Sequence, residues 1–262
     1  MDTSIERMFG RKGARVKLSQ DVSRRNPAGI DIKTDRLGEF FDIRVEAEDD
    51  VEYAVVDLRV DLRHLLLMAR RPQTKNKFLC GHDERHWFVC AVPGQSVSNV
   101  EAAMHALQPT EVRLAVNRRV KRDKNKLRRK NEAFVRQGEW FFIPVPELIV
   151  NETLVLKNEP ISRGNGSKAH MCQFLYRSGG EVVYVGSKYP MGLTKEAYSK
   201  LLKRNPSARS WAWQVMRRNA AVYVRGRVWH KDHKTIVLND WHRVMMNTEG
   251  RAAGAQHVVF LD

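Results

Sequence analysis

The sequence lacks the features that would place it in a membrane or an oxidising compartment. No apolar run approaches the ~20 residues that a membrane-spanning helix needs, and the segment Met1 to Arg7 lacks the apolar core of a secretory signal. The cysteines, Cys80, Cys90 and Cys172, are too few and odd in number for a disulfide framework. We therefore expect a cytoplasmic protein with reduced thiols and no membrane partner.

Signatures of several common protein classes are also missing. The chain has no Walker-type phosphate loop, no dinucleotide-binding fingerprint, no Ser-His-Asp signature and no consensus RNA-recognition sheet motif. These absences remove the motif-based grounds for a nucleotide hydrolase, a dinucleotide-dependent dehydrogenase or a serine hydrolase. No reaction is named by the sequence.

Acidic residues are scarce relative to basic ones. The chain has 30 Asp and Glu against 46 Lys and Arg, a formal net charge of +16, and a sequence pI near 10.0. Such a field attracts polyanions, so we expect a nucleic acid as partner. With 262 residues, of which 42% are hydrophobic, the chain can bury one large core or two ordinary ones.

The pattern of apolar residues predicts an α+β protein. Residues 1–37 show little periodicity and are expected to form a basic irregular arm. Residues 38–108 are expected to form an α+β domain with a mixed sheet of about five strands and a helix that starts at the N-cap Ser98, with Glu101 in capping-box spacing. The expected strands are Phe40–Val45, Tyr53–Leu58, His64–Met68, Lys77–Cys80 and His86–Val92.

A strongly basic segment follows. Residues 109–137 predict one long helix, with Val112, Val116 and Val120 on its apolar stripe and Gly138 as its stop. Residues 118–130 hold nine basic residues against one Asp, a net +8. We expect these side chains to contact nucleic-acid phosphates, although a solvated linker helix or a basic tether would have the same composition. The nine are Arg118, Arg119, Lys121, Arg122, Lys124, Lys126, Arg128, Arg129 and Lys130.

Residues 138–262 predict a β-rich, barrel-like domain with inserted helices. Gly179-Gly180 is expected to turn a hairpin between strands at 171–176 and 182–185, and helices are expected to start at Thr194 and at Ser207. Trp211, Trp213, Tyr223, Trp229 and Trp241 alternate with arginines in this part of the chain. Exposed aromatic rings beside basic residues can stack on unpaired bases, but such rings more often fill a small β-core.

Histidines gather in the same region. His230 and His233 stand at the expected bend of a hairpin, and His170 follows a Gly-rich loop. Three neutral imidazoles would suit Zn or another divalent transition metal, with Asp232 or Glu139 assisting as acid, base or orienting partner. Contact with an anion or a substrate, or a set of surface histidines at a turn, are the alternatives.

A second group lies at Cys80, His82, Asp83 and His86. Cys90 follows four residues after His86. On a strand these two residues would be roughly 13 Å apart, so Cys80, His82, His86 and Cys90 do not easily form a single tetrahedral site. A ligand-contacting turn or an ordinary polar hairpin tip remain as alternatives.

The C-terminal half resembles a family of uncharacterised bacterial and phage proteins. The matching segments are Gln137–Val145, Arg163–His170, His230–Leu238 and Phe260–Asp262. Glu139 stands where the family has Asp, and His170 alone stands where the family has His-x-His. The resemblance implies that His170 groups with His230 and His233, and it implies no reaction.

These observations predict a protein that binds nucleic acid, RNA more than DNA, and carries a histidine cluster. A metal-dependent hydrolase or nuclease that uses His170, His230 and His233 is the alternative. A second alternative is a structural component of a phage or ribonucleoprotein assembly, in which the charge neutralises a polyanion.

Overall fold

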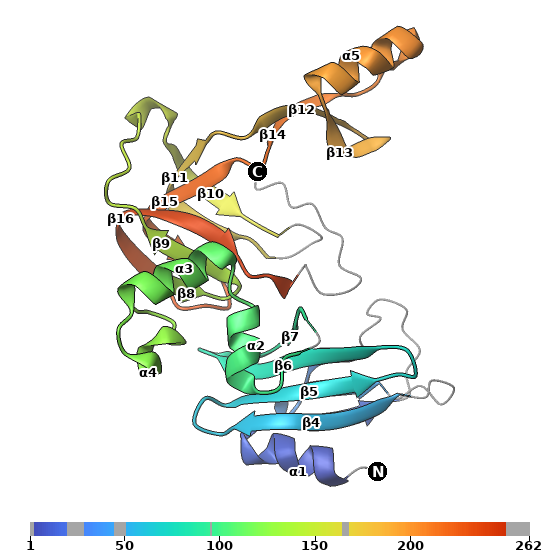
Figure 1. The fold of residues 1–262 in the computed structure, drawn as a ribbon, viewed down its shortest axis with the longest axis vertical. Helices are drawn as coiled ribbons and strands as arrows, with labels where there is room; N and C mark the ends of the chain where they lie inside the picture. Colours follow the sequence, from blue (N-terminus) through green and yellow to red (C-terminus); the bar gives the residue numbers. More distant parts are fainter. Residues whose placement is uncertain (1–2, 20–28, 45–50, 95, 164–167, 250–262) are drawn as a thin grey trace. The chain divides into compact units, whose positions relative to one another are not determined.

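The computed structural model describes residues 3–19, 29–44, 51–94, 96–163 and 168–249 (Figure 1). The chain forms two compact units. The first contains the described residues up to Trp140 and again those from Met246 on, and the second contains Phe141–Met245. The expected α+β class is confirmed.

The first unit begins with a helix and a small mixed sheet. Helix α1 (Thr3–Arg11) precedes strands β1 (Val16–Ser19), β2 (Ile30–Asp35) and β3 (Gly38–Arg44). β3 is central, parallel to β1 and antiparallel to β2. The described part of the expected irregular arm, residues 1–37, is therefore ordered. The prediction was wrong because Phe9 packs edge to face on Phe41 at 4.9 Å, a long-range contact that local periodicity does not reveal.

A four-stranded antiparallel sheet forms the centre of the same unit. Its strands follow chain order and are β4 (Glu52–Arg59), β5 (His64–Arg70), β6 (Lys75–Asp83) and β7 (His86–Ala91). Leu65 and Leu67 contribute to the core shared with α1 and β3, whereas Leu66 packs against α2 (Val100–Ala106). Burial of both faces explains the unbroken apolar run of β5. The expected five strands therefore divide between two sheets.

The start of α2 differs from the prediction by one residue. Asn99, not Ser98, is the N-cap, and its Oδ1 accepts a hydrogen bond of 2.8 Å from the Ala102 amide. Glu101 makes an ion pair with Arg59 on β4. The expected capping-box role of Glu101 is thus replaced by a contact between helix and sheet.

The expected long basic helix is two short helices. α3 (Thr110–Arg119) ends where Val120 takes an extended conformation, and α4 (Asp123–Lys126) is a single turn. Val112, Val116 and Val120 are buried as the stripe predicted. Repulsion among neighbouring like charges disfavours continuation of the helix. Asn131 then organises a turn, because its Oδ1 accepts from the Ala133 and Phe134 amides at 2.9 and 3.0 Å.

The largest described sheet is open, and most of its strands belong to the second unit. The sheet order is β10-β11-β15-β16-β9-β8, so β10 and β8 are its edges and the described strands do not close into the expected barrel. Its strands are β8 (Val135–Gln137), β9 (Trp140–Pro144), β10 (Leu156–Ile161), β11 (His170–Ser178), β15 (Ala221–Trp229) and β16 (Ile236–Met246). A short 3-10 helix, η1 (Glu152–Leu154), precedes β10.

A further module lies in the chain between β11 and β15. Its elements are β12 (Glu181–Gly186), β13 (Tyr189–Thr194), α5 (Lys195–Arg204), η2 (Pro206–Ser210) and β14 (Gln214–Arg218). We call Glu181–Arg218 the inserted module; Figure 1 shows its helix α5 in orange. β12 pairs with β13 and β14, in the order β13-β12-β14.

Two predictions for this module were wrong and one was right. Gly179-Gly180 does not turn a hairpin between β11 and β12; the ribbon of β11 and β15 instead continues into that of β12 and β14. The helix expected from Ser207 is the short η2, and Val215 lies in strand β14. Thr194 caps α5 as predicted, with its Oγ1 accepting from the Ala197 amide at 3.2 Å.

None of the described helices is both long and apolar enough to cross a membrane. The centre of the Gly-rich loop, residues 164–167, and the C-terminal residues 250–262, which include the segment Phe260–Asp262, lie outside the described residues.

Candidate metal centre

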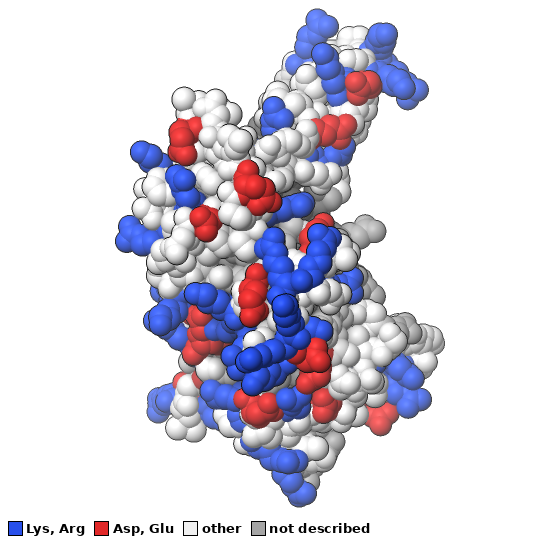
Figure 2. Space-filling view, turned by 60° about the vertical axis from the view of Figure 1, so that its left-hand side comes forward, with Lys and Arg blue, Asp and Glu red and all other residues white. Residues whose placement is uncertain are grey.

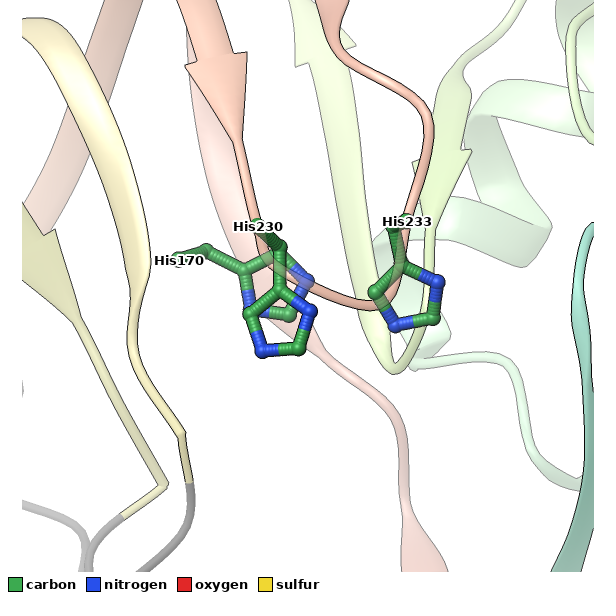
Figure 3. A group of neighbouring side chains, drawn as sticks. All are labelled: His170, His230 and His233. Atoms are coloured by element: carbon green, nitrogen blue, oxygen red, sulfur yellow. The ribbon is translucent and has the colours of Figure 1, made fainter.

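Strand register brings the three predicted histidines together. β11 pairs with β15 so that Met171 is opposite Trp229, and His170 therefore lies next to His230, the residue that follows β15. His233 stands on the same β15–β16 connection, three residues further on. Figure 3 shows the three rings pointing to the same side of this connection. The hairpin expected at this bend is confirmed by the pairing of β15 with β16.

The rings are close enough to share one ligand. The His170 and His230 rings are stacked, with centroids 4.2 Å apart, and the His233 centroid is 5.3 Å from His170 and 4.8 Å from His230. One nitrogen from each ring lies within 4.8 Å of the others. Ligand nitrogens on one tetrahedral zinc ion are about 3.3 Å apart, given Zn–N bonds of about 2.0–2.1 Å. The stacked rings would have to turn for their in-plane lone pairs to converge on one ion at this spacing.

Burial keeps His170 neutral. Its side chain is 1% exposed, and its pKa is lowered to about 3, first by burial and then by the neighbouring His230 and His233. A neutral imidazole offers a lone pair to a metal, whereas an imidazolium does not. The environment of His170 is therefore that of a metal ligand more than that of a phosphate-binding cation.

Asp232 tethers the site but not in the expected way. Its carboxylate makes an ion pair of 2.6 Å with Lys168, which joins the β15–β16 connection to the residues before β11. Its backbone amide donates to Nδ1 of His230 at 3.1 Å. In the neutral His230 ring the proton is then on Nε2. A metal bound at Nε2 would need the proton to move to Nδ1 and this amide contact to open.

Glu139 and His242 do not join the cluster. The group of potential metal ligands among the described residues consists of the three histidines and includes neither Asp232 nor Glu139. Glu139 lies in the turn between β8 and β9, where its carbonyl accepts from the Asn247 amide at 2.8 Å. His242, on β16, is buried and its Nδ1 is 2.8 Å from the Asp240 carbonyl oxygen.

No model of a known protein family, no curated protein and no solved structure matches this chain. Its candidate sites therefore rest on their own geometry.

The predicted second site is dispersed. The Cys80 thiol is buried in the core of the first unit, and burial raises its pKa to about 11. The His82 ring packs edge on against Trp87 at 4.8 Å, and His86 Nδ1 is 2.7 Å from a carboxylate oxygen of Glu39. Asp83 makes ion pairs with Arg129 and Arg136. The four side chains thus have separate structural partners and do not form a common site.

The basic segment at 118–130 is mostly exposed. Seven of its nine cations are exposed, whereas Lys126 pairs with Asp123 at 2.7 Å and Arg129 pairs with Glu84 at 2.8 Å and with Asp83. Figure 2 shows many Lys and Arg side chains on the face that comes forward, with acidic side chains among them. The exposed members are Arg118, Arg119, Lys121, Arg122, Lys124, Arg128 and Lys130.

The structure also groups aromatic residues that the sequence left scattered. Trp211 and Trp213 lie beside Tyr189, with Lys188 over the Trp211 ring at 4.2 Å. Tyr189 and Lys188 carry no local signal of this role, since the contact depends on the pairing of β12 with both β13 and β14. Trp241 instead packs with Tyr176 in the six-stranded sheet.

Proposed function

We propose that this chain binds nucleic acid, RNA more than DNA, and that His170, His230 and His233 hold a divalent transition metal ion. The nucleic-acid part rests on the exposure of seven cations between Arg118 and Lys130. Such side chains gain affinity for phosphates by releasing counterions, so the affinity falls as salt rises. RNA is favoured because part-exposed aromatic rings beside cations suit unpaired bases.

Binding to labelled RNA and DNA fragments tests this part of the proposal. We expect the logarithm of the binding constant to fall linearly with the logarithm of the salt concentration. The quadruple variant R118Q/K121Q/R122Q/K124Q should bind more weakly at every salt concentration and show a shallower slope, by roughly 0.7 per lost contact on a single strand. A matched variant in which four exposed cations elsewhere are replaced, R7Q/R36Q/K75Q/K157Q, should keep most of the slope. Equal loss in both variants would leave only a general charge effect.

The metal part rests on the convergence of three imidazoles from the start of β11 and from the β15–β16 connection. Elemental analysis and titration with Zn²⁺ or Co²⁺ measure it directly. His230→Ala and His233→Ala should each lower the affinity by more than the ~10–100-fold that loss of an outer-shell partner costs. His86→Ala is the matched control, because it removes an exposed histidine paired with Glu39. Substoichiometric metal with unchanged affinity in the two cluster variants would refute the site.

A metal-dependent hydrolase or nuclease is the second candidate function. Three protein ligands leave a coordination position for water, and a bound divalent metal lowers the pKa of that water. The observation that favours it is the buried, neutral state of His170 beside two part-exposed histidines. Cleavage of RNA or DNA with added Zn²⁺ or Mn²⁺ that disappears in His233→Ala would establish this activity. Stoichiometric metal without cleavage would leave a binding protein, including a component of a larger nucleoprotein assembly.

A further inference from the structure

Three aromatic rings of the inserted module form one cluster. We call Tyr189, Trp211 and Trp213 the aromatic platform. Their ring centroids are 6.4, 5.9 and 6.0 Å apart in the three pairs, and their planes lie within 19–23° of one another. In a column of three rings the outer pair would be twice as far apart as the neighbours. The three nearly equal distances therefore exclude a straight column and place the rings in one triangular cluster.

Contacts within the module hold Trp213, one ring of the platform, in place. Trp213 donates from Nε1 to the Ala208 carbonyl oxygen at 2.7 Å. A Cβ on Gly186 would come within 3.3 Å of the Trp213 ring, so the ring lies close against the backbone of β12. Tyr198 of α5 contacts Trp213 edge on at 5.0 Å and stacks on Tyr184 at 4.1 Å. Trp213 is thus held by contacts within the module before any partner binds.

The inserted module that carries the platform is rich in cations. The inserted module has eight Lys and Arg against two Glu, a net charge of +6. Lys188 lies over the Trp211 ring at 4.2 Å, and Arg218 pairs with Glu181 at 2.6 Å. All three platform rings are part-exposed. The exposed cations of the module are Lys188, Lys195, Lys200, Lys203, Arg204, Arg209 and Arg217.

We propose that the aromatic platform binds the unpaired bases of a single-stranded nucleic acid, while the surrounding cations contact its phosphates. Base faces stack on aromatic rings irrespective of sequence, and a cationic rim follows the backbone. In a duplex the base faces are covered by their neighbours, so the platform selects single strands. This inference deepens the proposed function and rests on it, because it names the substrate class of a nucleic-acid-binding chain.

Oligonucleotides that differ only in their bases test the proposal. A labelled single strand of uridines is compared with an abasic strand of equal length and charge, and with a duplex, at fixed salt by fluorescence anisotropy. The full-length chain should prefer the uridine strand to the abasic strand by roughly five- to hundredfold, the range that base–aromatic stacking contributes. Trp211→Leu and Tyr189→Leu should each reduce this ratio, and Trp211→Phe should keep most of it. Val215→Ala, an exposed apolar change on β14, is the matched control and should leave the ratio unchanged.

The outcomes separate this inference from the proposed function. Equal affinity of the unmodified chain for uridine and abasic strands would overturn the platform proposal, while salt-dependent binding would uphold nucleic-acid binding. Absence of binding to every strand at low salt would overturn both. Thermal melting of each variant checks its fold, and Trp211→Phe, which retains the ring, keeps the test decisive if Trp211→Leu melts early. Variants at Arg118 and Arg122 should weaken binding to both strands equally.

Discussion

Asp83 lies at the end of β6, where its carboxylate contacts Arg129 and Arg136. It is 8% exposed, so the carboxylate is largely removed from water. Removing one partner of a buried ion pair leaves an uncompensated charge, which typically costs about 3–5 kcal/mol. A residue type that is common in catalytic sites therefore stabilises the contact between β6 and the segment after α4.

Asp83→Asn should lower the free energy of unfolding by more than about 1 kcal/mol in urea denaturation, but by less than the about 3–5 kcal/mol of a fully buried pair, because Arg129 is part-exposed and keeps Glu84. The matched change is Asp123→Asn, which removes the exposed partner of Lys126 and should cost less than about 1 kcal/mol. Equal effects of the two substitutions would show that the Asp83 ion pairs contribute no more than a surface pair.

We expect the buried His64 to make the free energy of unfolding fall in mild acid. Burial lowers its pKa to about 4 from 6.5, so between these values the unfolded chain takes up a proton that the folded chain does not. The contribution of neutral His64 to the free energy of unfolding is therefore fully present above pH 6.5, and it is lost progressively as the pH falls to about 4. At pH 5 this loss is about 2 kcal/mol.

A substitution isolates this contribution from those of other histidines. His64 contacts the Leu62 carbonyl oxygen through Nδ1, and an Asn side chain places a non-titrating N–H near the same acceptor. Between pH 7 and pH 5, His64→Asn should lose about 2 kcal/mol less of its unfolding free energy than the unmodified chain does. Parallel pH profiles for the two proteins would exclude His64 as the titrating group.

At the scale of secondary structure, local signals predicted some elements well. Thr194 was identified as an N-cap because its side chain and the following helical pattern are adjacent in sequence. The β15–β16 hairpin was predicted from two apolar runs around a polar bend. The basic helix was wrong because Val112, Val116 and Val120 keep helical spacing although the helix ends at Arg119.

Gly179 and Gly180 connect β11 to β12, where the paired strands β11 and β15 continue into the paired strands β12 and β14. Gly179 and Gly180 have φ of +71° and +77°, values that L-residues with a side chain rarely adopt. A Cβ on Gly180 would lie 2.8 Å from the Ala220 nitrogen and from the Arg218 carbonyl oxygen, whereas one on Gly179 would meet nothing within 4 Å. A side chain at Gly179 would therefore meet backbone strain alone, whereas one at Gly180 would meet both backbone strain and a steric clash.

Gly179→Ala should cost about 1–2 kcal/mol of unfolding free energy, from the left-handed conformation alone. Gly180→Ala should cost clearly more, because the backbone of the opposite strand must also move. Chemical denaturation compares the two variants, and hydrogen exchange should show the additional loss of protection in β12 and β14. Equal destabilisation by both substitutions would mean that the backbone at Ala220 moves away from the added Cβ at no cost in free energy.

At the scale of the whole molecule, the candidate site depends on strand register. The resemblance of short motifs grouped His170 with His230 and His233, but their spacing in sequence carries no distance. The pairing of Met171 with Trp229 sets that distance, and a shift of one residue would point His170 to the other face of the sheet. For the same reason the sequence did not reveal that Tyr189 lies beside Trp211 and Trp213.

The first unit is completed by residues that follow the second unit in the chain. Thr248 is 8% exposed. Its Oγ1 donates to the Ala106 carbonyl oxygen at 2.6 Å, and its backbone amide donates to the Leu107 carbonyl oxygen at 3.1 Å. The Glu249 carboxylate accepts from the Ala91 amide at 3.2 Å. The two Thr248 contacts satisfy carbonyl groups at the end of α2, which otherwise lack partners within the helix.

Thr248→Val should therefore destabilise the first unit although the residue follows the second. Loss of a buried hydrogen bond that leaves a carbonyl unsatisfied costs about 1–3 kcal/mol. Hydrogen exchange should show the loss of protection in α2, while the strands β11 and β15 stay protected. Thr153→Val is the matched control, because it removes an exposed hydroxyl that bonds only to nearby Asn151. If α2 exchanged at an unchanged rate in Thr248→Val, closure of the first unit by the returning chain would be refuted.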